Sequence, residues 1–194
     1  MRELSLHLLD IAQNSIVAGA ACITLWVEEQ PETDRLTIGV ADDGRGMTPE
    51  QLVAVRDPFY TTRTTRKVGM GVPLLRMAAE MAGGGLSIES EVGKGTTLTA
   101  TFQLSRIDRA PLGDMIGTVS ALIRLNPALD FVYRYTRGTS GFEMETRELR
   151  GILGDVPLDT PDVLRWIEEY LAEQQQQVER AAADTPTSRH KEDL

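Results

Sequence analysis

Cysteine is nearly absent from this chain, because Cys22 is the single cysteine among 194 residues. One thiol cannot form an internal disulfide, and it excludes metal sites built from several cysteines. No apolar run approaches the ~20 residues that a membrane-spanning helix needs. The N-terminus also lacks the layout of a signal peptide. These absences predict a soluble, cytoplasmic protein without a membrane partner.

Basic residues are scarce as well, with 20 Lys and Arg against 29 Asp and Glu and a formal net charge of −9. The acidic excess is spread along the chain. A broad nucleic-acid-binding face would need clustered Lys and Arg, so we expect no nucleic-acid partner. Hydrophobic residues make up 41% of the chain, which is ordinary for a globular protein.

The hydrophobic pattern up to residue 104 predicts the order helix, strand, strand, helix, strand, strand. This order favours an α+β fold, a two-layer α/β sandwich with a mostly antiparallel sheet. The predicted segments are a helix over 3–18, strands over 22–27 and 36–40, a helix starting at Thr48-Pro49-Glu50, a helix over 73–81, and strands over 86–90 and 97–104.

Beyond residue 108 the pattern changes to a second α-β-β-α unit. Its predicted elements are a helix over 112–125, strands over 131–136 and 142–149, and a helix over 162–172. From Gln174 onward the chain is polar, which is typical of a frayed helix end followed by disorder. We predict a first domain over 1–107, a small C-terminal α-β-β-α extension over 108–173, and a flexible polar tail over 174–194.

Polar side chains recur on the first predicted helix. His7, Asp10 and Asn14 are three and four residues apart, so they lie on one helix face, opposite the apolar stripe. An amide oxygen can ligate Mg²⁺, and a carboxylate one turn earlier can orient or deprotonate a water. The same spacing also fits a solvated polar face.

Asp42-Asp43-Gly44-Arg45-Gly46-Met47 follows directly after a predicted strand. The first Asp is a fixed acceptor, and the glycines let a flat ring approach the backbone closely. A carboxylate is a strong, charge-assisted acceptor for an exocyclic amine such as that of adenine. An acidic glycine turn without a ligand fits the motif equally well.

Two further glycine motifs lie later in the chain. Arg66-Lys67-Val68-Gly69-Met70-Gly71 precedes a predicted helix, where backbone N–H groups and the positive helix end suit phosphate oxygens. It is neither a Walker A loop nor a Rossmann fingerprint. Gly93-Lys94-Gly95-Thr96 is a turn before the last strand of the first domain. Each motif alone also fits an ordinary loop or hairpin.

The order of these motifs resembles the N, G1, G2 and G3 boxes of the GHKL superfamily, and residues 57–63 resemble the F box of histidine kinases. The resemblance spans about residues 3–104 and implies the Bergerat ATP-binding fold. It implies Mg-ATP as ligand, with Asn14 on Mg²⁺ and Asp42 on adenine N6. The other implied contacts are Gly44, Gly46 and Met47 at the base, Arg66, Lys67, Gly69 and Gly71 at the phosphates, Thr96 supporting Asp42, and a lid over 57–68.

Three positions depart from the family pattern. Asp10 stands where relatives place Glu or Asn, and Asp is one methylene shorter than Glu. Asp43 stands where Asn is common, and Lys67 replaces a glycine that often opens the G2 box. We nevertheless predict Asp10 as the general base, because it is acidic and shares a helix face with Asn14.

Three functions fit the resemblance. The first is an ATP-dependent protein kinase of the histidine-kinase or anti-sigma type, and the second is a nucleotide-gated binding module without phosphoryl transfer. The third, a gyrase-like ATPase clamp, is disfavoured because a large transducer region is missing. Neither His7 nor His190 has the context of a phosphoacceptor, so the kinase hypothesis predicts an acceptor on a separate protein. The extension over 108–173 is predicted to bind a partner or to form a homodimer.

Overall fold

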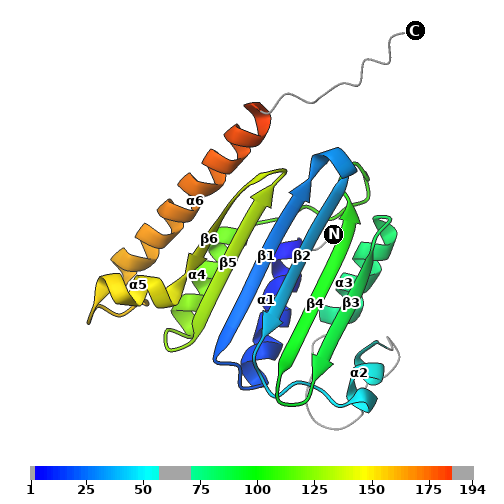
Figure 1. Ribbon diagram of the computed structural model, residues 1–194, viewed down its shortest axis with the longest axis horizontal. Helices are drawn as coiled ribbons and strands as arrows, with labels where there is room; N and C mark the ends of the chain where they lie inside the picture. The colour runs from blue at the N-terminus through cyan, green and yellow to red at the C-terminus, as the bar shows by residue number, and fades with distance from the viewer. Residues whose placement is uncertain (1–2, 57–70, 185–194) are drawn as a thin grey trace.

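The computed structural model describes residues 3–56 and 71–184, which form a six-stranded sheet with helices packed on one face (Figure 1). The other face of the sheet carries no helix of the described residues and is turned to the viewer in Figure 1. The predicted α+β class and the two-layer α/β sandwich are therefore confirmed.

The sheet has the strand order β3-β4-β2-β1-β5-β6. Neighbouring strands are antiparallel, except that β1 and β5 are parallel. The mostly antiparallel sheet that the sequence predicted is thus observed. The strands are β1 (Cys22–Gln30), β2 (Arg35–Asp42), β3 (Gly85–Glu91), β4 (Gly95–Gln103), β5 (Asp130–Arg137) and β6 (Ser140–Glu145).

The helices begin and end close to the predicted positions in most cases. At the start of α2 the hydroxyl of Thr48 accepts from Gln51 N, and the side chain of Gln51 accepts from Thr48 N, so the predicted cap is a reciprocal one. The helices are α1 (Leu4–Val17), α2 (Pro49–Arg56), α3 (Gly71–Met81), α4 (Met115–Leu125), α5 (Thr146–Leu153) and α6 (Pro161–Asp184), with a 3-10 turn over Pro31–Thr33.

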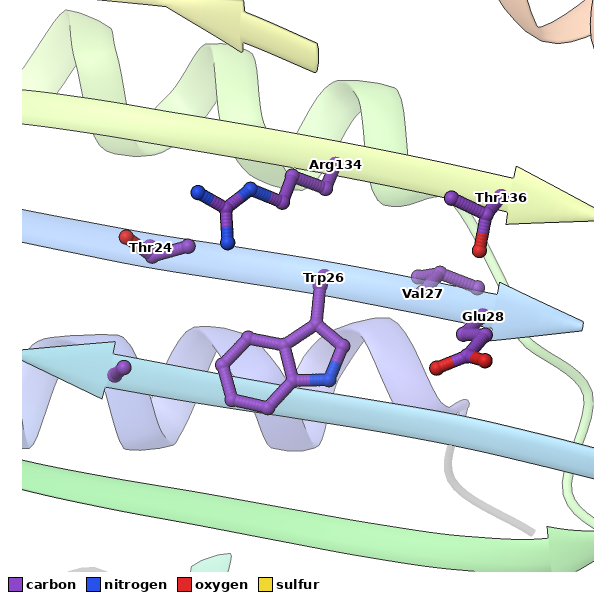
Figure 2. Close-up of a pocket in the computed structure, with 7 residues that line it drawn as sticks. Thr24, Trp26, Val27, Glu28, Arg134 and Thr136 are labelled. Atoms are coloured by element: carbon purple, nitrogen blue, oxygen red, sulfur yellow. The ribbon is translucent and has the colours of Figure 1, made fainter. Parts of the chain in front are cut away.

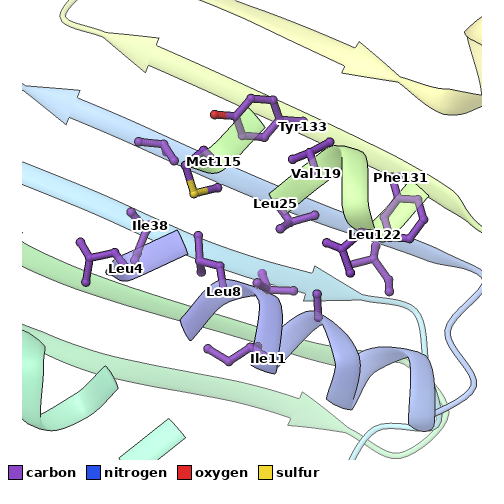
Figure 3. Packing of buried hydrophobic residues seen from close by; sticks show 14 of the residues in the cluster. Leu4, Leu8, Ile11, Leu25, Ile38, Met115, Val119, Leu122, Phe131 and Tyr133 are labelled. Carbon is purple, nitrogen blue, oxygen red and sulfur yellow. The ribbon is translucent and has the colours of Figure 1, made fainter. Parts of the chain in front are cut away.

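One apolar core lies between the sheet and the helices (Figure 3). Leu4, Leu8 and Ile11 of α1 point into it, as the stripe in the sequence predicted. Helix α4 lies beside α1 and adds Val119 and Leu122 to the same core. Burying each such side chain stabilises the fold by roughly 1.5–3 kcal/mol.

The C-terminal extension shares this sheet and this core. Strand β5 pairs with β1, with Asp130 beside Cys22. The predicted strand over 142–149 is wrong in its second half, because the chain turns into α5 at Thr146. The buried hydroxyl of Thr146 accepts a hydrogen bond from Phe131 N (2.8 Å). This contact ties the residue after β6 to the start of β5.

Helix α6 is much longer than the sequence predicted. It continues through the glutamine run to Asp184, so residues 174–184 are helical and do not form the expected polar tail. Leu171 and Val178, seven residues apart, are both buried and hold this part of the helix on the protein. The side chain of Gln175 also donates to Glu179 (2.9 Å). No helix of the described residues is long and apolar enough to cross a membrane.

Candidate nucleotide-binding site

Asp42 and Thr96, two of the predicted site residues, lie side by side at one end of the sheet, where β2 ends and β1 and β4 begin (Figure 1). Asp42 is the last residue of β2, and in the sheet it lies between Ile23 of β1 and Thr96 of β4. The alternation along β2 turns Asp42 toward the helical layer, because Ile38 and Val40 on the same side are buried.

The carboxylate of Asp42 is held by two donors. The hydroxyl of Ser15 in α1 donates to Oδ2 (2.5 Å), and Gly44 N donates to Oδ1 (2.9 Å). Ser15 is buried, and Asp42 is half-buried. Helix α1 and the turn after β2 therefore fix the orientation of the carboxylate, which keeps lone pairs for an amine donor.

The glycines of this turn are needed for close approach. A Cβ on Gly44 would lie 2.9 Å from Asp42 Oδ1 and 3.1 Å from the backbone oxygen of Ala18. Gly46 has a φ of +66°, and a Cβ there would lie 1.9 Å from the backbone oxygen of Glu91. The turn after β2 thus packs against the helix on one side and against the β3–β4 hairpin on the other.

Ser90 in β3 links the first and last glycine motifs. Its hydroxyl accepts from Met47 N (2.9 Å), donates to the backbone oxygen of Gly95 (2.9 Å), and lies 2.8 Å from Thr96 Oγ1. Thr96 is next to Asp42 in the sheet, and its hydroxyl contacts that of Ser90.

Helix α1 carries Asp10 and Asn14 one turn apart on the same side. Asn14 is exposed, and Asp10 is half-buried beside the first residue of α3, because a Cβ on Gly71 would lie 3.0 Å from the Asp10 Cβ. Gly71 is itself buried at this contact between α1 and α3. His7, which the spacing placed on the polar face with them, is buried.

Asp43 has a structural role. Its Oδ1 accepts from Ala21 N (2.7 Å) and Cys22 N (2.9 Å), so the carboxylate ties the turn after Asp42 to the start of β1. An amide oxygen would make the same bonds, which explains why an Asp serves where relatives carry Asn. Burial raises the pKa of the Cys22 thiol, and the charges of Asp43 and Asp130 add to the effect.

Some predicted site residues lie outside the described ranges 3–56 and 71–184. These residues are Arg66, Lys67 and Gly69, together with the F box over 57–63, the lid over 57–68, and His190.

The metal prediction rests on one amide. Among the described residues there is no cluster of three or more His, Cys, Asp or Glu side chains that could hold an ion. Mg²⁺ commonly keeps several waters and binds one or two protein groups plus substrate phosphates. The exposed side chain of Asn14 fits that mode of binding.

The family model for histidine kinase-, DNA gyrase B- and HSP90-like ATPases matches residues 2–106, more than half of the chain. The chain belongs to this family, the GHKL ATPases. It therefore carries a GHKL ATP-binding domain, as the order of the boxes in the sequence predicted.

Relatives are similar to the chain over the same region. The sensor histidine kinase ZraS of Salmonella typhi is 36% identical over 93 residues, which are 47% of this chain and 20% of that kinase. The sensor kinase CckA of Brucella abortus is 32% identical over 101 residues, 50% of this chain and 11% of that protein. The chain thus spans a fifth or less of these curated relatives. In fold, it resembles the crystal structure of the N-terminal domain of a DNA repair protein, with a TM-score of 0.52 at 15% identity over 75% of this chain and 52% of that one.

Sequence reasoning missed two hydroxyls of this site. Ser15 belongs to the apolar stripe of α1, and Ser90 lies on the core-facing side of β3 with Ile88. A hydroxyl at a buried position needs a hydrogen-bond partner, so each was a signal for a polar contact nearby. The stripe alone gave no indication that the partner of Ser15 is Asp42.

Proposed function

We propose that this protein binds Mg-ATP at the end of β2 and transfers the terminal phosphoryl group to a separate protein partner. The observation that carries the proposal is the half-buried carboxylate of Asp42 at the end of β2, which Ser15 and Gly44 hold in one orientation. The likeness to histidine kinases over residues 2–106 supports phosphoryl transfer as the reaction.

The described residues fit the nucleotide. Asp42 would accept the adenine amine, while Gly44 and Gly46 let the turn after β2 pack closely against the end of α1 and the β3–β4 hairpin and so hold Asp42 in place. Asn14 would offer its amide oxygen to Mg²⁺, whose charge would compensate that of the phosphates when both are bound. In this arrangement Thr96 and Ser90 would keep the β3–β4 turn in contact with the strand end that carries Asp42.

Asp10 is the group proposed to accept the proton of the attacking hydroxyl or water. It precedes Asn14 by one helical turn, so a carboxylate and the amide proposed to bind Mg²⁺ stand on the same side of α1. A positioned general base contributes typically ~10²–10⁴-fold to the rate, with little effect on ground-state affinity. The carboxylate is therefore dispensable for binding and needed for turnover.

Two variants of Asp10 test this proposal. Asp10→Asn should keep ATP affinity in calorimetry and lose release of labelled phosphate, or its transfer to a captured partner, by ~10²-fold or more. Asp10→Glu should retain part of the rate, since it keeps the acid. Turnover that persists undiminished in Asp10→Asn would show that Asp10 is not the base.

A nucleotide-gated binding module is the second candidate, because the extension is hydrogen-bonded to the nucleotide end of the sheet. Asp130 N donates to Ala21 O (2.9 Å), and Ala21 N in turn donates to Asp43, the neighbour of Asp42. This candidate predicts ATP-dependent partner capture that is unchanged in Asp10→Asn and accompanied by no turnover. Both readouts can be taken on the same samples.

A further inference from the structure

The sheet face that lies opposite the helices, called here the open face, has an unusual composition. Its outward side chains alternate along each strand with those that face the helices, and burial follows this alternation in β1 and β5. Many of them are small or hydroxylated, and Trp26 is the one aromatic side chain among the outward positions of the described strands. The threonines of the open face are Thr24, Thr37, Thr97, Thr99, Thr101 and Thr136.

Trp26 lies flat on the sheet. Gly39 is its partner in β2, and a Cβ on Gly39 would lie only 2.0 Å from Cζ2 of the indole. One side of the ring therefore packs on glycine backbone, while the side chain as a whole is only half-buried. A planar ring fixed in this way is a ready-made platform for a cation or another planar group.

A pocket of about 420 Å³ borders this ring (Figure 2). Trp26, Glu28 and Ala41 come from the part of the chain that matches the family model, whereas Arg134 and Thr136 come from the extension. The pocket thus exists because β5 is added beside β1. Figure 2 shows the Arg134 guanidinium near Thr24 at one end, with Glu28 at the other.

The charge of the open face is negative. Arg134 is ion-paired with Glu143, its partner in β6, so its charge is compensated. Glu28 is half-buried and follows Trp26 by two residues on the same side of β1. Of the outward strand positions, six are acidic and two are basic: Glu28, Glu89, Glu91, Asp130, Glu143 and Glu145 against Arg35 and Arg134. Asp130 is ion-paired with Arg147 and Arg150, and Glu91 with Lys94, so the acidic surplus lies on Glu28, Glu89 and Glu145.

We infer that the open face docks a basic polypeptide segment of a partner protein, with an arginine or lysine side chain stacked on Trp26 and paired with Glu28. The aromatic ring and the carboxylate together attract a cation, and Glu89 and Glu145 on the edge strands of the same face favour further basic residues. Hydroxyls of Thr24 and Thr136 offer hydrogen bonds to its backbone. This inference rests on the proposed function and adds the chemistry of the partner to it. Because its test uses no nucleotide, the docking of a basic segment and the binding of ATP can be refuted separately.

The full chain with Trp166→Phe provides the test, because Trp26 is then the remaining tryptophan. The probe is the capped peptide Arg-Gly-Arg-Gly-Arg, titrated while the emission of Trp26 is recorded. We expect a saturable change that weakens as salt is added. Its acidic counterpart, Glu-Gly-Glu-Gly-Glu, should produce no change.

Matched charge variants distinguish peptide binding at the pocket from attraction by the net charge of the protein. Glu28→Gln should weaken peptide binding about fivefold, from the loss of one partly buried partner of the cation. Glu173→Gln removes the same charge from the exposed side of α6 and should change the affinity less than about twofold. Trp26→Leu, followed by calorimetry, should weaken binding about threefold or more.

Several results would overturn the inference. Equal weakening by Glu28→Gln and Glu173→Gln would mean that only the net charge attracts the peptide. Unchanged Trp26 emission at millimolar peptide would mean that Trp26 packs on Gly39 and does not bind a cation. Saturable binding of a thymidine oligonucleotide to the same variant would point to a nucleic acid and away from a basic protein segment.

Discussion

Replacing Asp42 by Asn is the sharpest perturbation of the proposed nucleotide site. The substitution keeps the size of the side chain, and the surrounding bonds can adapt to it. The new amide oxygen would accept from Gly44 N, and the new NH₂ group would face Ser15. The Ser15 hydroxyl can accept this hydrogen bond while donating to Ile11 O, which is 3.4 Å away. The fold should therefore persist.

The substitution should instead lower the affinity for ATP. In the Asp42→Asn variant an NH₂ group, a donor, would face the region where the parent carboxylate offers lone pairs to the adenine amine. Losing a charge-assisted bond and leaving a buried donor unmatched costs ~2–4 kcal/mol, which is a ~30- to 1000-fold loss of ATP affinity. GTP should bind poorly to the parent protein, because its C6 oxygen would face the carboxylate.

Calorimetry on Asp42→Asn beside Asp43→Asn is the decisive assay. The control makes the same charge change one residue away, and its remaining side-chain oxygen can still accept from Ala21 N and Cys22 N. Its ATP affinity should stay within about twofold of the parent, since the local bonds survive. The reasoning is refuted if Asp42→Asn binds ATP within about threefold of the parent, or if both variants lose affinity equally.

Three further substitutions probe the same site. Asn14→Ala should weaken Mg-ATP much more than metal-free nucleotide in titrations with and without EDTA, and equal losses would make Asn14 a packing residue. Ser15→Ala should lower ATP affinity about tenfold by calorimetry, less than Asp42→Asn, because it removes one of the two donors that fix the carboxylate. Gly46→Ala should lower the free energy of unfolding in urea by about 3 kcal/mol, because it adds a clash with Glu91 to left-handed strain, whereas Gly93→Ala, with open space around it, should cost only ~1–2 kcal/mol.

The sequence was sufficient for the fold wherever a local signal agreed with the tertiary packing. The apolar stripe Leu4–Leu8–Ile11 and the cap at Thr48 act within a few residues, so periodicity and capping rules identify them. The order of the four boxes, spread over residues 3–104, predicted the family. Each box alone was ambiguous.

The errors have a common physical cause. The second half of the predicted strand over 142–149 is helical, because Thr146 is fixed by Phe131 in another strand, a contact between residues far apart in sequence. The glutamine run is helical because Leu171 and Val178 pack on the protein, which polar composition does not indicate. His7 is buried although its spacing suited a polar face, because α1 packs against α3 and α4 as well as against the sheet.

The extension over 108–173 contributes two strands to the same sheet that carries Asp42. The sequence alone does not predict where the C-terminal unit packs. In the structure β5 pairs with β1, and the start of β1 is tied to the turn after Asp42, because Ala21 N and Cys22 N donate to Asp43. Trp26 lies on the same strand, four residues beyond Cys22. The pocket on the open face and the carboxylate of Asp42 are therefore connected through one strand and its backbone bonds. A partner docked on this face would contact the same strand whose start is tied to Asp43, so the proposed partner site and the proposed nucleotide site would be coupled through the sheet itself.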